Sequence, residues 1–179
     1  MNDTQRRWVL RNRTAEAHAI VDAAIGAFDD RESYKRYLLA TYRFRIPMER
    51  RLEGFDWPDG LGDWRPRRIG AQLTADLLDF DLPLPDLEDF ASPLEQSRLY
   101  GALYVLEGSS LGAQVLLRRA EDLGLSSDFG ARHLAVQSTV ESWRGFLVHL
   151  EAAQPFDIDL ATAASLDTFA AAAQAFLRD

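Results

Sequence analysis

The sequence has 179 residues, about the length of a single domain. Its 28 acidic residues outnumber its 20 basic residues, and the net charge of −8 argues against a protein that binds the phosphate backbone of nucleic acids. Cysteine is absent, which excludes disulfides, cysteine-ligated metal centres and thiol nucleophiles. No apolar run approaches the roughly 20 residues that cross a bilayer, so we expect a cytoplasmic protein with no membrane partner.

Apolar residues recur at steps of three and four along most of the chain, a period typical of α-helices. We therefore predict an all-α fold with one domain over residues 1–179. The first helix is predicted over about 4–28 and the second over about 33–55. Pro47 lies inside the second helix, and because proline has no N–H to donate, we expect a kink there.

Turn-forming residues at 57–62 and prolines at 83 and 85 separate the next helices without forming a domain linker. Ser92, Pro93 and Glu95 form a typical helix start: a capping residue, a proline in the first turn and an acidic residue three positions after the cap. Four further helices are predicted, over about 69–80, 92–124, 140–150 and 160–176.

Three glycines, Gly101, Gly108 and Gly112, lie on one face of the predicted helix over 92–124. Each glycine costs roughly 1 kcal/mol relative to alanine inside a helix, so some interaction has to compensate. The face can accept a neighbouring helix at close range, or it can accept a flat ligand against the backbone. From the spacing alone, helix packing is the favoured interpretation.

The chain has only three histidines, and His18 stands out because Asp22 follows it by one helical turn. A carboxylate in that position orients one ring nitrogen and leaves the other free for a metal. His133 and His149 have no such companion and are predicted to be structural or solvated.

No Glu-x-x-His or His-Glu-x-x-His pattern occurs, which excludes di-iron bundles and zinc hydrolases of that type. Ser109 lies within a predicted helix, so it is no acyl-transfer nucleophile.

Two segments together resemble the heme oxygenase family, in its bacterial biliverdin-forming, phytochrome-associated branch. Residues 10–18, LRNRTAEAH, followed by 34–48, are similar to the family's proximal helix and the helix after it. Residues 104–114, YVLEGSSLGAQ, are similar to its glycine-containing distal helix. The resemblance implies a single helical bundle in which the distal helix is kinked.

The resemblance also implies where heme, both substrate and cofactor, is bound. His18 would be the iron ligand with Asp22 behind it, and the backbone from Gly108 to Gly112, with Ser109, would form the catalytic distal face. The remaining heme contacts implied by the resemblance are Arg11, Thr14, Ala113 and Arg144, with the two arginines near the propionates.

The implied reaction cleaves heme with O2 and external electrons to biliverdin, carbon monoxide and iron. Because the sequence has no flavin or nicotinamide motif, a separate donor of the ferredoxin or flavin reductase type is expected, and a phytochrome is a possible user of the product. Ser109 replaces the aspartate of animal members, and Ala113 replaces a common second glycine. These departures keep a second interpretation open, a heme- or bilin-binding protein without ring-opening activity. A helical scaffold without a cofactor is a third.

Overall fold

The computed structural model describes residues 5–88 and 94–178, and within these ranges it contains seven α-helices, one short 3-10 helix and no β-strand. The all-α prediction is confirmed. None of the described helices has the length and apolar character needed to cross a membrane. The elements are α1 Arg6–Ile25, α2 Arg31–Arg51, η1 Asp59–Leu61, α3 Gly70–Asp79, α4 Gln96–Asp122, α5 Arg132–Gln137, α6 Glu141–Ala152 and α7 Ile158–Leu177.

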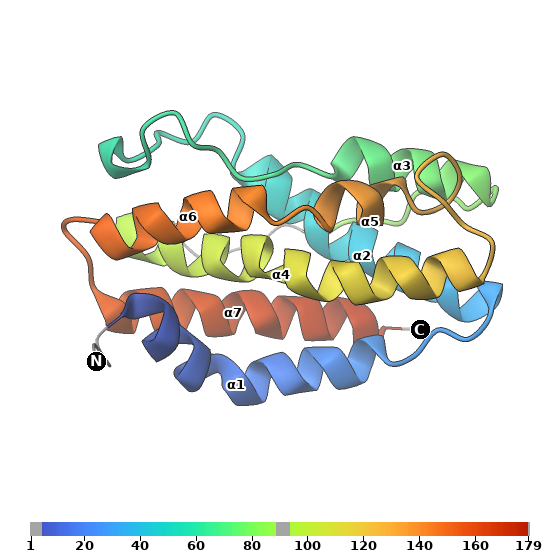
Figure 1. Cartoon of the computed structure of the whole chain (residues 1–179), viewed down its shortest axis with the longest axis horizontal. Helices are drawn as coiled ribbons and strands as arrows, with labels where there is room; N and C mark the ends of the chain where they lie inside the picture. Colours follow the sequence, from blue (N-terminus) through green and yellow to red (C-terminus); the bar gives the residue numbers. More distant parts are fainter. Residues whose placement is uncertain (1–4, 89–93, 179) are drawn as a thin grey trace.

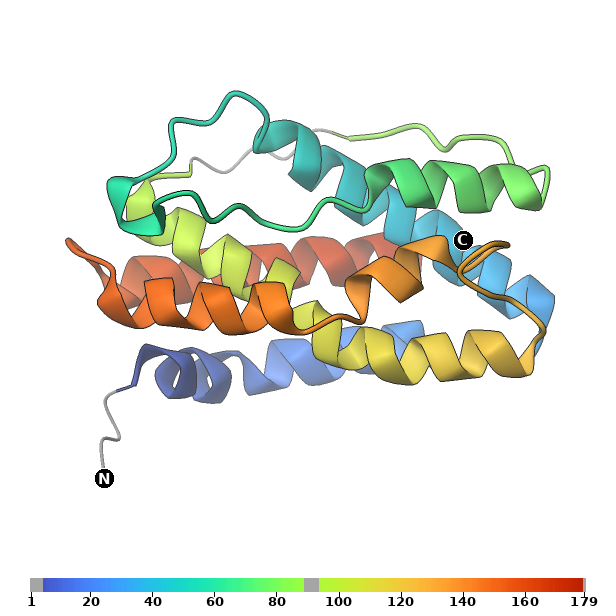
Figure 2. The same ribbon diagram turned by 45° about the horizontal axis from the view of Figure 1, so that its top comes forward.

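Helix α7 is the central support of the bundle and packs against α1, α2 and α4 (Figure 1). Helices α2, α3 and α5 form the side of the molecule remote from α1, and α6 lies beside the first half of α4. Figure 2 shows α4 changing direction near its middle, as expected for the kinked distal helix. Two groups of buried apolar side chains fill the interior, one along α1, α4, α6 and α7 and one among α2, α3, α4 and α5.

The helix boundaries differ from the predicted ones by a few residues, for local reasons. Helix α1 ends at Ile25 because Gly26 adopts a positive φ of 62°. Helix α2 begins before Ser33, since the side chain of Asp30 accepts a hydrogen bond from the Ser33 amide at 2.7 Å and caps the first turn. Pro47 lies inside α2 and does not end it.

The predicted start of the long helix at Ser92 and Pro93 lies outside the described residues. Within them, Leu94 and Glu95 are not helical, and α4 begins at Gln96. The predicted end is close, because Gly124, with a φ of 77°, follows the cap of α4 directly. The six-residue helix α5 was not predicted from the sequence.

Gly101 lets α4 and α7 approach at backbone distance. A Cβ atom at this position would lie 2.0 Å from the carbonyl oxygen of Ala161, a contact that no side chain can make. The Ser165 hydroxyl adds a hydrogen bond to the Gly101 carbonyl at 2.9 Å. At Gly101 the glycine therefore serves helix packing, which confirms that interpretation for this one position.

A buried ion pair fixes the segment that leads into α3. Arg45 and Glu49, both on α2, are almost fully buried and lie 3.3 Å apart. The Glu49 carboxylate also accepts hydrogen bonds from the amides of Ile69 and Gly70, at 2.8 and 3.1 Å, where α3 starts. The Arg45 guanidinium donates to the Arg67 carbonyl at 3.0 Å. The pair is thus tied to backbone groups that would otherwise be unsatisfied at the start of a helix.

We expect Glu49→Ala to lower the free energy of unfolding by about 3–5 kcal/mol, because it leaves the Arg45 charge buried without its partner. Glu53→Ala is the matched control. Glu53 pairs with Arg68 at an exposed site, where such a pair contributes less than about 1 kcal/mol. Urea denaturation followed by circular dichroism measures both, and equal effects would contradict the assigned role of Glu49.

Candidate functional site

His18 is an exposed histidine held in a defined orientation on α1. Its Nδ1 lies 3.0 Å from the Asp22 carboxylate, and its ring packs edge-on against Phe169 of α7, with 5.6 Å between ring centroids. The predicted contact between His18 and Asp22 is confirmed. The side chain of His18 is 60% exposed although it has two neighbours that orient it.

This arrangement leaves Nε2 of His18 available. With Nδ1–H donating to Asp22, Nε2 carries the lone pair, and no hydrogen bond of the described residues uses it. The described ranges contain no cluster of three or more His, Asp or Glu side chains that could hold a metal ion. His18 is therefore suited to give one bond to a metal whose other ligands come from a bound group.

The first two turns of α1 carry positive charge. The guanidinium groups of Arg7 and Arg11 both lie over the indole of Trp8, at 4.6 and 5.3 Å from its centroid. Arg11 is exposed, as is Arg144 on α6. Thr14, in contrast, is buried, and its hydroxyl donates to the Leu10 carbonyl within the same helix. The structure therefore gives Thr14 a packing contact and no outward-facing group.

The second half of α4 presents an open face at Gly112. A Cβ atom added at Gly112 would meet nothing within 4 Å, whereas one at Gly108 would make ordinary contacts with Trp143 at 3.7 Å. Leu111 and Val115 are about half exposed on either side of Gly112 in the sequence. Exposed apolar side chains beside bare backbone are typical of a surface that an apolar ligand covers. Sequence analysis singled out the glycine but not Leu111 or Val115, because their exposure is not visible in the sequence.

The side chain of Ser109 contacts α5. The sequence alone did not indicate this partner. Its hydroxyl donates to the Leu106 carbonyl at 2.5 Å and accepts a hydrogen bond from the Gln137 amide at 2.7 Å. Ala113 is 1% exposed and belongs to the core group among α2, α3, α4 and α5. Its methyl group therefore packs inside the bundle and not on the open face at Gly112.

The other two histidines have structural contacts, as predicted. His133 is fully buried, and its Nδ1 lies 2.8 Å from the Asp76 carboxylate. Burial lowers the pKa of His133 below that of a free histidine, which favours the neutral ring. His149 donates from Nδ1 to the Gly60 carbonyl at 2.9 Å and ties α6 to the loop after α2.

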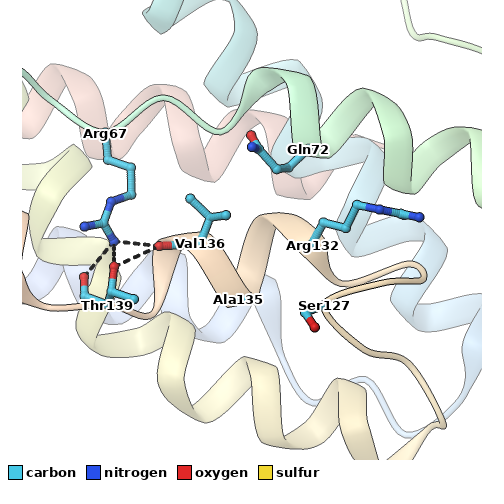
Figure 3. A pocket seen from close by; sticks show the side chains of 7 residues that line it. All are labelled: Arg67, Gln72, Ser127, Arg132, Ala135, Val136 and Thr139. Carbon is cyan, nitrogen blue, oxygen red and sulfur yellow. Dashed lines mark hydrogen bonds between the residues drawn. The ribbon is translucent and has the colours of Figure 1, made fainter.

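A groove of about 690 Å³ lies between α3 and α5, on the side of the molecule remote from α1 (Figure 3). Arg67 and Arg132 lie at opposite ends of it. Arg67 already donates to the carbonyls of Val136 and Thr139, at 2.6 and 2.8 Å, and Arg132 pairs with Asp76 at 3.0 Å. Both cations are thus engaged by acceptors of the chain, and the groove lacks the available charge that the start of α1 has.

Comparison with known proteins identifies heme oxygenases that are similar to this chain. No family model matches the sequence. The chain is 28% identical over 145 residues to the heme oxygenase PigA of Pseudomonas aeruginosa, and the match covers 77% of this chain and 73% of that protein. The fold is similar to the NO- and CO-bound heme oxygenase of Neisseria meningitidis, with a TM-score of 0.74, 21% identity, and 97% and 92% of the two chains covered. The resemblance to heme oxygenases and the predicted fold are confirmed.

Gly101 and Gly112 allow a matched test of the two roles of glycine in α4. Gly101→Ala is expected to destabilise the protein by about 1–3 kcal/mol, because the new methyl group forces α4 away from α7. Gly112→Ala is expected to be neutral, or to stabilise the protein by up to about 1 kcal/mol through its helix propensity, since the methyl group meets open space. Thermal unfolding of the two variants without added ligand measures the difference, and similar losses in both would mean that Gly112 is also a packing position.

Proposed function

We propose that this chain, which is similar to heme oxygenases in sequence and fold, binds heme and opens the porphyrin ring with O2 and external electrons. The products would be biliverdin, carbon monoxide and iron. The observation that carries the proposal is His18, an exposed imidazole that Asp22 orients and whose Nε2 is unused. We propose that residues 1–179 act as one heme-oxygenase-like domain.

The residues present fit a heme group. His18 would supply the iron ligand, and Asp22 would hold the ring in the tautomer that leaves Nε2 free. The open backbone at Gly112, with Leu111 and Val115 beside it, would accept the apolar macrocycle without a steric conflict. Arg11 and Arg144 are exposed and would bind carboxylate groups such as the heme propionates.

The bound heme would supply the redox-active iron at which O2 is activated. The chain's own residues would bind and orient the substrate. His18 would hold the iron and the backbone from Gly108 to Gly112 would contact the macrocycle. Trp143 packs near Gly108, since a Cβ atom added there would lie 3.7 Å from its ring. The electrons would come from a separate donor of the ferredoxin or flavin reductase type. A phytochrome that uses the bilin, membership of the phytochrome-associated branch and a cytoplasmic location stay predictions from the sequence.

Ser109 supports both the enzyme and the binding-protein alternative. Its oxygen can accept one more hydrogen bond, which would hold a water molecule on the distal side. Its hydrogen, however, is directed to the Leu106 carbonyl, so it would donate a proton only after the hydroxyl turns. We propose that Ser109 helps to order water, together with backbone groups at Gly108 and Gly112, and that it is replaceable. A heme- or bilin-binding protein is the second candidate because this serine lacks the charge of an aspartate.

We expect His18→Ala to abolish the ferric absorption spectrum of a histidine-ligated hemin complex, because its Nε2 is the proposed iron ligand. Asp22→Asn is expected to be milder, with at most about a tenfold loss of hemin affinity, since the amide oxygen still accepts from the ring. Hemin titration followed in the Soret region measures both. His149→Ala is the control, and loss of the spectrum in that variant alone would overturn the assignment of His18.

Gly112→Leu is expected to prevent hemin binding while the protein stays helical, because the side chain would fill the space assigned to the macrocycle. Far-ultraviolet circular dichroism checks the fold and hemin titration checks binding. The wild-type protein is the control. If the wild-type protein also fails to bind hemin, the chain is a helical scaffold without a cofactor and the proposed function is wrong.

Bilin yield from hemin, O2 and a reductant decides between enzyme and binder. We expect the wild-type protein to form bilin and release iron. Ser109→Ala should slow the reaction by less than the roughly 100-fold that follows loss of a general acid, and Ser109→Asp should preserve or raise the rate. Intact hemin binding with no bilin from the wild-type protein would favour the binding protein.

A further inference from the structure

Three side chains that line one small cavity behind the middle of α4 each have a buried polar atom without a partner. The atoms are Nε of Arg45, Oγ of Ser110 and Oε1 of Gln137, and none has a hydrogen-bond partner among the described residues. The cavity measures about 10 Å³, lies where α2, α4 and α5 meet, and is lined by all three side chains. Arg45 and Ser110 are only 3% and 4% exposed.

Leaving three buried polar atoms unpaired is costly, whereas one shared partner would satisfy them together. The atoms have complementary roles, because Arg45 donates, Gln137 accepts and the Ser110 hydroxyl does either. The Glu107 carboxylate also lines the cavity and adds an acceptor. A volume of about 10 Å³ is near the lower limit for one water molecule, which typically makes about three hydrogen bonds in a protein interior.

We propose that this cavity binds one ordered water molecule, held by Arg45, Ser110 and Gln137. The water accepts from Arg45 and donates to Oε1 of Gln137. This hydrogen bond fixes the Gln137 amide with its Nε2 toward Ser109, which it reaches at 2.7 Å. The water thereby ties α5 to α4 next to the Gly108–Gly112 segment. Because it depends only on the folded chain, the site is independent of heme binding.

A crystal structure of the ligand-free protein, at a resolution that shows ordered solvent, tests the site directly. We expect a single density peak in the cavity within hydrogen-bond distance of the three side chains. A cavity without density, or a direct hydrogen bond between Arg45 and Gln137 that closes it, would overturn the proposal.

Ser110→Ala tests whether the water fixes the amide of Gln137. With one of its three partners removed, we expect the side-chain amide resonances of Gln137 in ¹⁵N-labelled protein to shift. Gln114 is the internal control, because its amide donates to the Ser138 carbonyl at an exposed site. Unchanged Gln137 resonances would contradict the coupling. If the variant does not fold, the wild-type crystal structure still decides whether the water is bound.

Discussion

The contact between Gly101 of α4 and the backbone of α7 constrains the arrangement of the other helices. Only a glycine fits there, since a Cβ atom would overlap the Ala161 carbonyl. The Ser165 hydroxyl adds a hydrogen bond to the carbonyl of Gly101. Helix α7 also carries α1, including the ring of His18 through Phe169. One helix therefore positions both the histidine and the glycine-containing segment, and a shift of α7 would move them together.

The three glycines of α4 share a face by their spacing but have different surroundings. A Cβ atom added at Gly101 would meet backbone, one at Gly108 would meet the edge of Trp143, and one at Gly112 would meet nothing within 4 Å. Next to Gly108 in the sequence, α4 is held by polar contacts. Glu107 accepts from the Arg67 amide at 2.7 Å, and Ser109 is bonded to Gln137. Apolar packing at one end and polar contacts in the middle thus secure α4 while the backbone near Gly112 stays accessible.

The sequence predicts best what local geometry decides. Helical periodicity places six of the seven helices, and the spacing of His18 and Asp22 is enough to predict their contact because residues four apart meet on a helix. Helix α5 has only six residues, and it depends on Asp76 of α3, which accepts from the amides of Arg132 and His133. That contact joins residues more than 50 positions apart, so no local pattern indicates it. For the same reason, the sequence did not reveal the burial of Arg45 or the partner of Ser109.

Under the proposed function, the distribution of charge explains how an acidic chain would bind an anionic ligand at the start of α1. Arg6 and Arg13 are engaged within the protein, with the Leu150 carbonyl and with Asp159. Arg11 has no such acceptor within residues 5–88 and 94–178, and it shares the indole of Trp8 with Arg7. Since charges are screened beyond about 8 Å at physiological salt, the net charge of −8 has little effect on a carboxylate that contacts Arg11. Recognition there would depend on the nearest guanidinium groups. Because these groups already stack on Trp8, they would lose less conformational freedom when a ligand binds.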